Sequence, residues 1–111
     1  MKYLEIPKCL NPNGKLAYKI ITDFLLKHEM TYTGGCKAFY SPEEWNDRGE
    51  KYGTKSHLVV VYDGGDLSRI FNSDYAALNG YKLYEDLSNS LREYDLFFEE
   101  ATNWYGAIYS V

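Results

Sequence analysis

Two segments of the chain repeat hydrophobic residues at the three- and four-residue spacing of an amphipathic helix. The first segment, roughly residues 13–29, has an N-cap in Asn11 or Asn13, and its apolar positions are Leu16, Ala17, Ile20, Ile21, Phe24 and Leu25. The second segment, residues 81–94, is expected to bury Leu83, Tyr84, Leu87, Leu91 and Tyr94. Its other side faces water with Lys82, Glu85, Asp86, Asn89 and Glu93.

A third, shorter helix is predicted from local capping signals. Ser41 suits the N-cap, Pro42 suits the first helical position, and Glu44 completes a capping box. This helix is expected to end near Gly49 to Gly53. The stretch from Asn72 to Gly80 is expected to be a loop or a single helical turn.

Alternating and β-branched segments predict the strands. SHLVVVY (56–62) is a buried strand, and DLSRIF (66–71) is its expected hairpin partner. KYLEI (2–6) is a short strand closed by Pro7, and TYTGGCKAFY (31–40) is strand-like on both sides of a turn or bulge at Gly34-Gly35. The end of the chain is a hairpin, with strands at 96–101 and 104–111 and a turn at Thr102-Asn103.

These elements predict one compact α+β domain over residues 1–111, with a largely antiparallel sheet and two to three helices on one face. The composition, 45% hydrophobic and 25% charged, supplies a packed core. No stretch reaches the roughly 20 apolar residues of a membrane helix, and the N-terminus lacks the hydrophobic region of a signal peptide. We therefore expect a cytoplasmic protein, in a bacterial host cell.

Charge is distributed unevenly along the sequence. Residues 1–61 carry nine Lys/Arg and seven Asp/Glu, or +2, whereas residues 62–111 carry three and nine, or −6; together they give the net charge of −4. An acidic half disfavours direct binding of nucleic acid, because phosphate binding depends on Lys and Arg, and it favours partners with a basic surface. The twelve tyrosines exceed what a small core can bury with hydrogen-bonded hydroxyls, so several should be exposed.

The corner Asp63-Gly64-Gly65-Asp66 follows the strongest predicted strand. Two glycines between two aspartates are typical of a tight type I′ or II′ hairpin turn, because these turns need positive φ. The alternative is that Asp63 and Asp66 form a carboxylate pair for Mg²⁺ or Mn²⁺. The sequence has no phosphate-binding glycine motif.

Nucleophilic catalysis has one candidate arrangement, Cys36 with His57 and Asp63. The alternative is a reduced, buried Cys36 and a solvated His57. Without zinc-like ligand spacing we expect no structural metal, and we also expect no cofactor and no catalytic residue. The aromatic residues Trp104, Tyr105 and Tyr109 alternate along the last strand, so one set belongs to the core and the other is a possible exposed surface.

A small, acidic, tyrosine-rich chain with no catalytic signature resembles the anti-CRISPR and anti-restriction inhibitors of phages and mobile elements. LVVVYDGGDLSRIFN (58–72) and NWYGAIY (103–109) also look like segments of small bacterial and phage proteins. The resemblance implies a non-enzymatic inhibitor that occupies the basic nucleic-acid groove of an effector nuclease. Its predicted acidic face comprises Asp63, Asp66, Asp74, Tyr75, Tyr81, Glu85, Asp86 and Glu93. The alternative function is a small enzyme or a nucleotide- or metal-binding module that uses Cys36/His57 or Asp63/Asp66.

Overall fold

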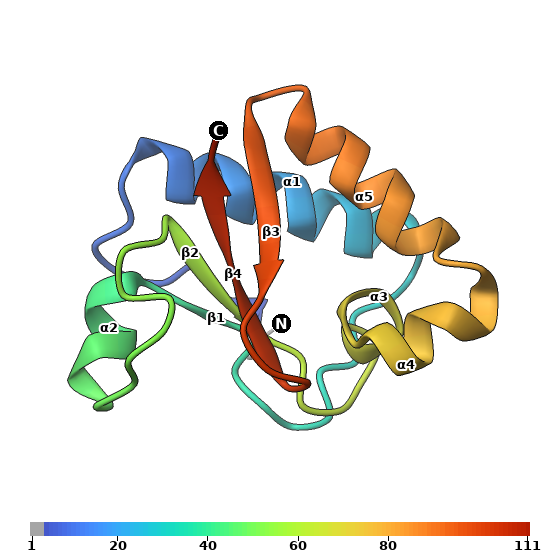
Figure 1. Ribbon diagram of the computed structural model, residues 1–111, viewed down its shortest axis with the longest axis horizontal. Helices are drawn as coiled ribbons and strands as arrows, with labels where there is room; N and C mark the ends of the chain where they lie inside the picture. Colours follow the sequence, from blue (N-terminus) through green and yellow to red (C-terminus); the bar gives the residue numbers. More distant parts are fainter. Residues whose placement is uncertain (1–3) are drawn as a thin grey trace.

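The computed structural model describes residues 4–111, and its centre is a four-stranded antiparallel sheet (Figure 1). The strands are β1 (Phe39–Tyr40), β2 (Leu58–Val61), β3 (Leu96–Glu100) and β4 (Tyr105–Ser110), and they lie in the order β1-β2-β4-β3. β3 and β4 form the predicted C-terminal hairpin, and β4 also pairs with β2. The α+β class with an antiparallel sheet is therefore confirmed.

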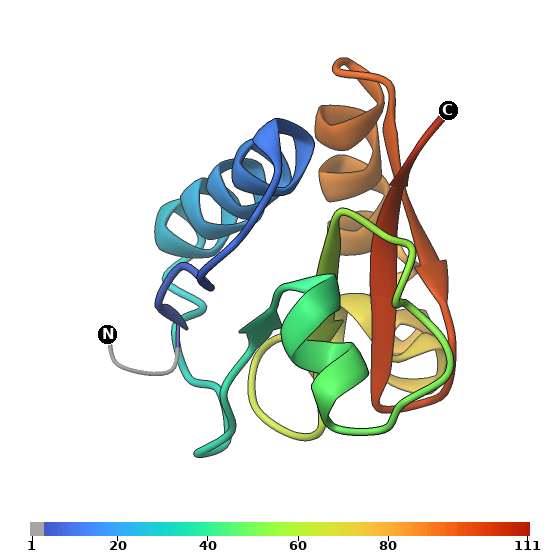
Figure 2. The ribbon, with the colours of Figure 1, turned by 90° about the vertical axis from the view of Figure 1, so that its left-hand side faces the viewer.

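Three helices contribute to the main core on one face of the sheet. They are α1 (Pro12–Lys27), α3 (Ser68–Phe71) and α5 (Lys82–Arg92), and α1 lies beside α5 on that side of the strands (Figure 2). Strand alternation turns Leu58 and Val60 of β2 and Ile108 of β4 toward these helices. The apolar faces predicted for the two long helices therefore pack together on this face of the sheet.

A second, smaller core covers the opposite face of the sheet. Helix α2 (Pro42–Asp47) buries Trp45 completely, and this side chain packs with Val59, Val61, Tyr105 and Ala107. The ring centroids of Trp45 and Tyr105 are 4.9 Å apart. Helices thus lie on both faces of the sheet, whereas the sequence predicted helices on one face only. The reason is that all four residues of β2 are buried, which requires cover on both sides.

The helix caps agree with the sequence. The Asn11 side chain accepts a hydrogen bond from the Gly14 N–H, which places the start of α1 at Pro12. At α2, Ser41 Oγ accepts from the Glu44 N–H at 3.1 Å, and the Ser41 N–H donates to Glu44 Oε1 at 2.9 Å. This arrangement is the predicted capping box. In the second amphipathic segment Tyr94 is wrongly predicted as buried, because α5 ends before it and it is 54% exposed.

The predicted strand at 66–71 is wrong, because Ser68–Phe71 form helix α3. Leu67, Ile70 and Phe71 are buried and have the i, i+3, i+4 spacing of a helical turn, while Arg69 stays exposed. A strand would have placed Arg69 on the same face as Leu67 and Phe71. The next helices, α4 (Ser73–Ala76) and the 3-10 helix η2 (Ala77–Asn79), occupy the stretch expected to be a loop or a single helical turn.

Two further strand predictions are corrected. Residues 31–33 are irregular and residues 34–35 belong to a turn, so only β1 remains of the predicted 31–40 segment, paired with β2. Residues 4–6 are not a strand, and residues 2–3 of that prediction lie outside the described residues. Within residues 4–111, no helix has the combination of length and hydrophobicity that crossing a lipid bilayer requires.

Candidate functional site

The Asp63–Asp66 corner is a turn between β2 and α3 and packs directly against the Gly34-Gly35 turn. Gly64 and Gly65 have φ of +97° and +73°, the positive values expected for these glycines. A Cβ atom on Gly65 would lie 2.5 Å from the carbonyl carbon of Thr33. The corner therefore needs glycine for a close approach of two backbones, a contact that no local pattern in the sequence indicates.

Asp66 ties the same two turns together. Its carboxylate Oδ2 accepts a hydrogen bond from the Tyr32 N–H at 3.1 Å, and its own N–H donates to the Tyr32 carbonyl at 2.7 Å. Arg69 lies 3.5 Å from the other carboxylate oxygen, Oδ1. Both oxygens of Asp66 thus have protein partners. In the part of the chain from residue 4 to 111, no group of three or more His, Cys, Asp or Glu side chains is arranged to hold a metal ion.

The structure does not bring Cys36 and His57 together. The Cys36 thiol lies beyond the end of β2 and donates to the Asp63 carbonyl at 3.5 Å. His57 precedes β2, about 13 Å or more away along the strand at the usual rise per residue. Its Nδ1 is 2.9 Å from Asn11 Nδ2 and its Nε2 is 3.0 Å from Ser110 Oγ. His57 therefore joins α1 to β4, and no Cys36/His57 dyad is assembled.

Two hollows open beside each other where α3 and α4 meet the turn between β3 and β4. The polar groove has a volume of about 470 Å³ and is lined by Tyr62, Asp63, Gly64, Gly65, Ser68, Asn72, Tyr75, Asn103 and Trp104. The Asn72 side-chain amide donates to the Asn103 carbonyl at 3.0 Å, which links the helical corner to the hairpin turn. Asn72 lines this groove and the next residue, Ser73, lines the second hollow, so the two hollows are neighbours.

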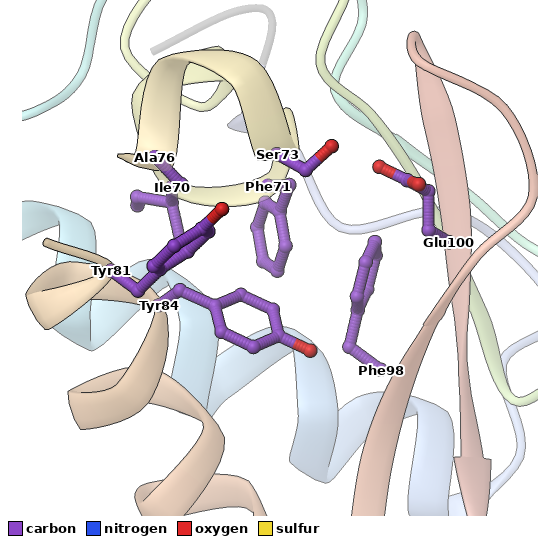
Figure 3. A pocket seen from close by; sticks show the side chains of 8 residues that line it. All are labelled: Ile70, Phe71, Ser73, Ala76, Tyr81, Tyr84, Phe98 and Glu100. Atoms are coloured by element: carbon purple, nitrogen blue, oxygen red, sulfur yellow. The ribbon is translucent and has the colours of Figure 1, made fainter. Parts of the chain in front are cut away.

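The second hollow, the aromatic pocket, has a volume of about 230 Å³ and is lined by Ile70, Phe71, Ser73, Ala76, Tyr81, Tyr84, Phe98 and Glu100. The four aromatic rings surround a common space, and the Glu100 carboxylate lies at its edge near Ser73 (Figure 3). The Phe71 and Phe98 centroids are 4.4 Å apart, and Tyr84 meets Phe98 edge-on at 6.3 Å.

Tyr81 reaches the aromatic pocket from an uncommon backbone conformation. It has φ +62°, immediately after Gly80 with φ +68°, and it precedes the first residue of α5. A left-handed conformation costs a non-glycine residue roughly 1–2 kcal/mol. The side chain is 43% exposed beside the pocket. Strain of this kind concentrates at functional sites.

The predicted acidic face is divided by the structure. Asp63, Asp74, Glu85 and Glu93 are exposed, and none of them forms an ion pair within residues 4–111. By contrast, Asp66 pairs with Arg69 and Asp86 pairs with Lys82 at 3.8 Å. Glu93 follows the last residue of α5 and is therefore separated from Tyr81 by the full length of an 11-residue helix, about 16 Å.

Glu100 and Trp104 line the hollows and were not included in the predicted face. Glu100 shares a face of β3 with Phe98, so it points toward the helices, and Trp104 lies between the second core and the polar groove. The alternation of β3 was a visible signal for Glu100. Tyr75 and Tyr81 are 53% and 43% exposed and line the two hollows, in agreement with the expectation that some tyrosines are exposed.

Tyr62 lies behind the polar groove and is almost completely buried. Burial raises the pKa of its hydroxyl far above the usual value of 10.0, and the nearby Glu100 carboxylate raises this pKa further. The hydroxyl donates to the Thr102 carbonyl at 2.8 Å. Tyr62 therefore acts as a neutral donor that holds the β3–β4 turn in place.

No family model matches the sequence, and the comparisons with curated proteins and with solved structures give no match.

Proposed function

We propose that the chain is a non-enzymatic binding protein whose two hollows and their acidic rims contact a basic surface on a protein partner. The observation that carries this proposal is that one exposed and one half-buried aromatic ring lie beside a carboxylate that forms no ion pair within residues 4–111. Tyr75 and Trp104 line the polar groove beside Asp63. Tyrosine, tryptophan and complementary charge are characteristic of protein-binding surfaces.

The partner class that fits this chemistry is an effector nuclease of a bacterial defence system. Such effectors hold guide and target nucleic acid in positively charged channels. Carboxylates on the groove rim compete for the Lys and Arg side chains that otherwise bind phosphates, and the aromatic rings add contact area. The resulting inhibitor acts by steric and electrostatic competition, in line with the anti-CRISPR and anti-restriction resemblance of the sequence.

The test is competition for DNA on purified, guide-loaded CRISPR effectors and on restriction enzymes. Fluorescence anisotropy of labelled target DNA is followed while the chain is added at several salt concentrations. Inhibition is expected to weaken as salt rises, because exposed charge pairs are screened. The double substitution Asp63→Asn with Asp74→Asn removes one carboxylate that lines the polar groove and one that is exposed on α4, next to Tyr75 in the sequence. It is expected to weaken inhibition about tenfold, from roughly 0.5–1 kcal/mol per exposed pair.

A matched control removes the same number of charges elsewhere. Glu43 and Asp47 are exposed on α2, on the other side of the sheet, and neither is in an ion pair within the described residues. Glu43→Gln with Asp47→Asn should leave inhibition unchanged. Equal weakening by the two double variants would reject the proposed face, and DNA binding unaffected by the chain across the panel would reject the inhibitor function.

A further inference from the structure

The aromatic pocket has the chemistry of a cation-binding cage. Its walls are the rings of Phe71, Tyr81, Tyr84 and Phe98, and its lining includes no Lys or Arg (Figure 3). The faces of aromatic rings are electron-rich and attract ammonium and guanidinium groups. With a volume of about 230 Å³, the pocket is smaller than the roughly 300–1,000 Å³ of sites for drug-sized ligands. It suits a single side chain.

Glu100 provides the charge that selects the occupant. Its carboxylate is at the edge of the pocket, and no Lys, Arg or His within residues 4–111 forms an ion pair with it. After burial, its charge is the next cause of the raised pKa of Tyr62, whose ring lies 6.0 Å from that of Phe98 in the pocket wall. An unpaired carboxylate beside aromatic rings complements a cation that is partly desolvated by the same rings.

We infer that the aromatic pocket receives one arginine side chain from the partner. A guanidinium is planar, stacks on aromatic rings and presents paired N–H donors to a carboxylate, whereas an ammonium is a compact and more strongly hydrated charge. Arginine is also enriched among the residues that dominate protein interfaces. The inference deepens the proposed function and rests on it, because it names the side chain that the basic partner inserts.

The pocket can be tested without any partner. Isotope-labelled chain is titrated with N-acetyl-arginine amide, with the neutral isostere N-acetyl-citrulline amide and with N-acetyl-lysine amide, and NMR shifts are followed at Tyr81, Tyr84 and Phe98. The arginine compound is expected to give saturable shifts at these residues. Citrulline is expected to bind at least about fivefold more weakly, the loss typical of removing a cation–π contact and a surface ion pair.

Substitutions at two positions, Glu100 and Tyr81, separate the contribution of the charge from that of the ring. Glu100→Gln is expected to weaken arginine binding, but by less than the change from arginine to citrulline does, because the rings still contact the cation. Tyr81→Leu is expected to weaken arginine binding, whereas Tyr81→Phe, which keeps the aromatic face, retains it. Because Tyr81 is exposed, neither variant removes core packing, and an unchanged spectrum away from the pocket verifies the fold.

Equal binding of arginine and citrulline, absence of saturable shifts, or unchanged binding by Tyr81→Leu would overturn the inference. Equal binding of lysine would overturn arginine as the occupant. These outcomes are distinguishable from failure of the proposed function, because the titration contains no effector and neither Asp63 nor Asp74 lines the aromatic pocket.

Discussion

The contact between the two glycine turns predicts that neighbouring glycines differ sharply in their tolerance of alanine. Gly64 and Gly65 both have positive φ, so alanine at either position costs roughly 1–2 kcal/mol of backbone strain. A Cβ on Gly64 meets nothing within 4 Å, whereas one on Gly65 falls 2.5 Å from the backbone of Tyr32 and Thr33. Forced overlap in a packed region adds typically about 1–3 kcal/mol.

Gly65→Ala is therefore expected to lower the free energy of unfolding by about 2–5 kcal/mol, and Gly64→Ala by about 1–2 kcal/mol. For a domain of this size the corresponding decreases in Tm are roughly 8–20 °C and 4–8 °C. Guanidinium denaturation followed by circular dichroism measures the first quantity, and thermal melting measures the second.

The facing turn contains a second matched pair. A Cβ on Gly34 would lie 3.0 Å from the Gly65 nitrogen, whereas one on Gly35 meets nothing within 4 Å. Gly65→Ala is expected to be the most destabilising variant and Gly34→Ala the second. Gly35→Ala and Gly64→Ala are expected to be the least destabilising. Equal losses within each pair would show that strain alone matters and would refute the backbone contact as the cause.

Two ionisable groups give pH-dependent predictions. Burial alone would raise the pKa of Glu44, but hydrogen bonds from Ser41 and Lys37 hold this pKa below its usual value of 4.5. The ionised carboxylate therefore stabilises the folded state at neutral pH, and this stabilisation is lost as the pH falls through the folded pKa. In urea denaturation, the free energy of unfolding of the wild type should exceed that of Glu44→Gln by about 0.5 kcal/mol near pH 7. This difference should disappear on acidification, and a difference that stayed constant with pH would contradict the prediction. Burial raises the pKa of Tyr62, so the stabilisation from its protonated hydroxyl is complete below pH 10 and is lost at higher pH. The free energy of unfolding of Tyr62→Phe should be about 1 kcal/mol below that of the wild type at pH 7. Denaturation measured at alkaline pH should give a smaller difference, and a larger difference would contradict the effect of burial on the Tyr62 pKa.

Local signals in the sequence predicted the caps and the long helices, because a cap depends on residues within three or four positions. The Ser41–Glu44 capping box and the burial of Leu87 and Leu91 are confirmed. The error at residues 66–71 arose from treating a short apolar segment as a strand. The spacing of Leu67, Ile70 and Phe71 already had the helical period, but the preceding strand and its glycine corner favoured a hairpin.

The parts of the site that the sequence did not reveal depend on long-range packing. The approach of Gly65 to Thr33 and the attachment of Asp66 to Tyr32 join positions 32 and 34 residues apart, and no local pattern encodes such a contact. The aromatic pocket likewise combines α3, the start of α5 and β3. Glu100 is exposed at the edge of this pocket, and its position beside α3 and Ser73 depends on the helix that replaced the expected strand.

The paired glycine turns also bear on the order of folding. Bringing Tyr32 to Asp66 directly would close a long loop, and loop closure costs more entropy as the loop lengthens. Pairing of Phe39 with Val60 shortens that loop, so the turns meet at low additional cost once β1 and β2 are joined. The turn contact should therefore form after the folding transition state. Gly65→Ala would then accelerate unfolding and leave the folding rate nearly unchanged, which makes this corner a determinant of the lifetime of the native state.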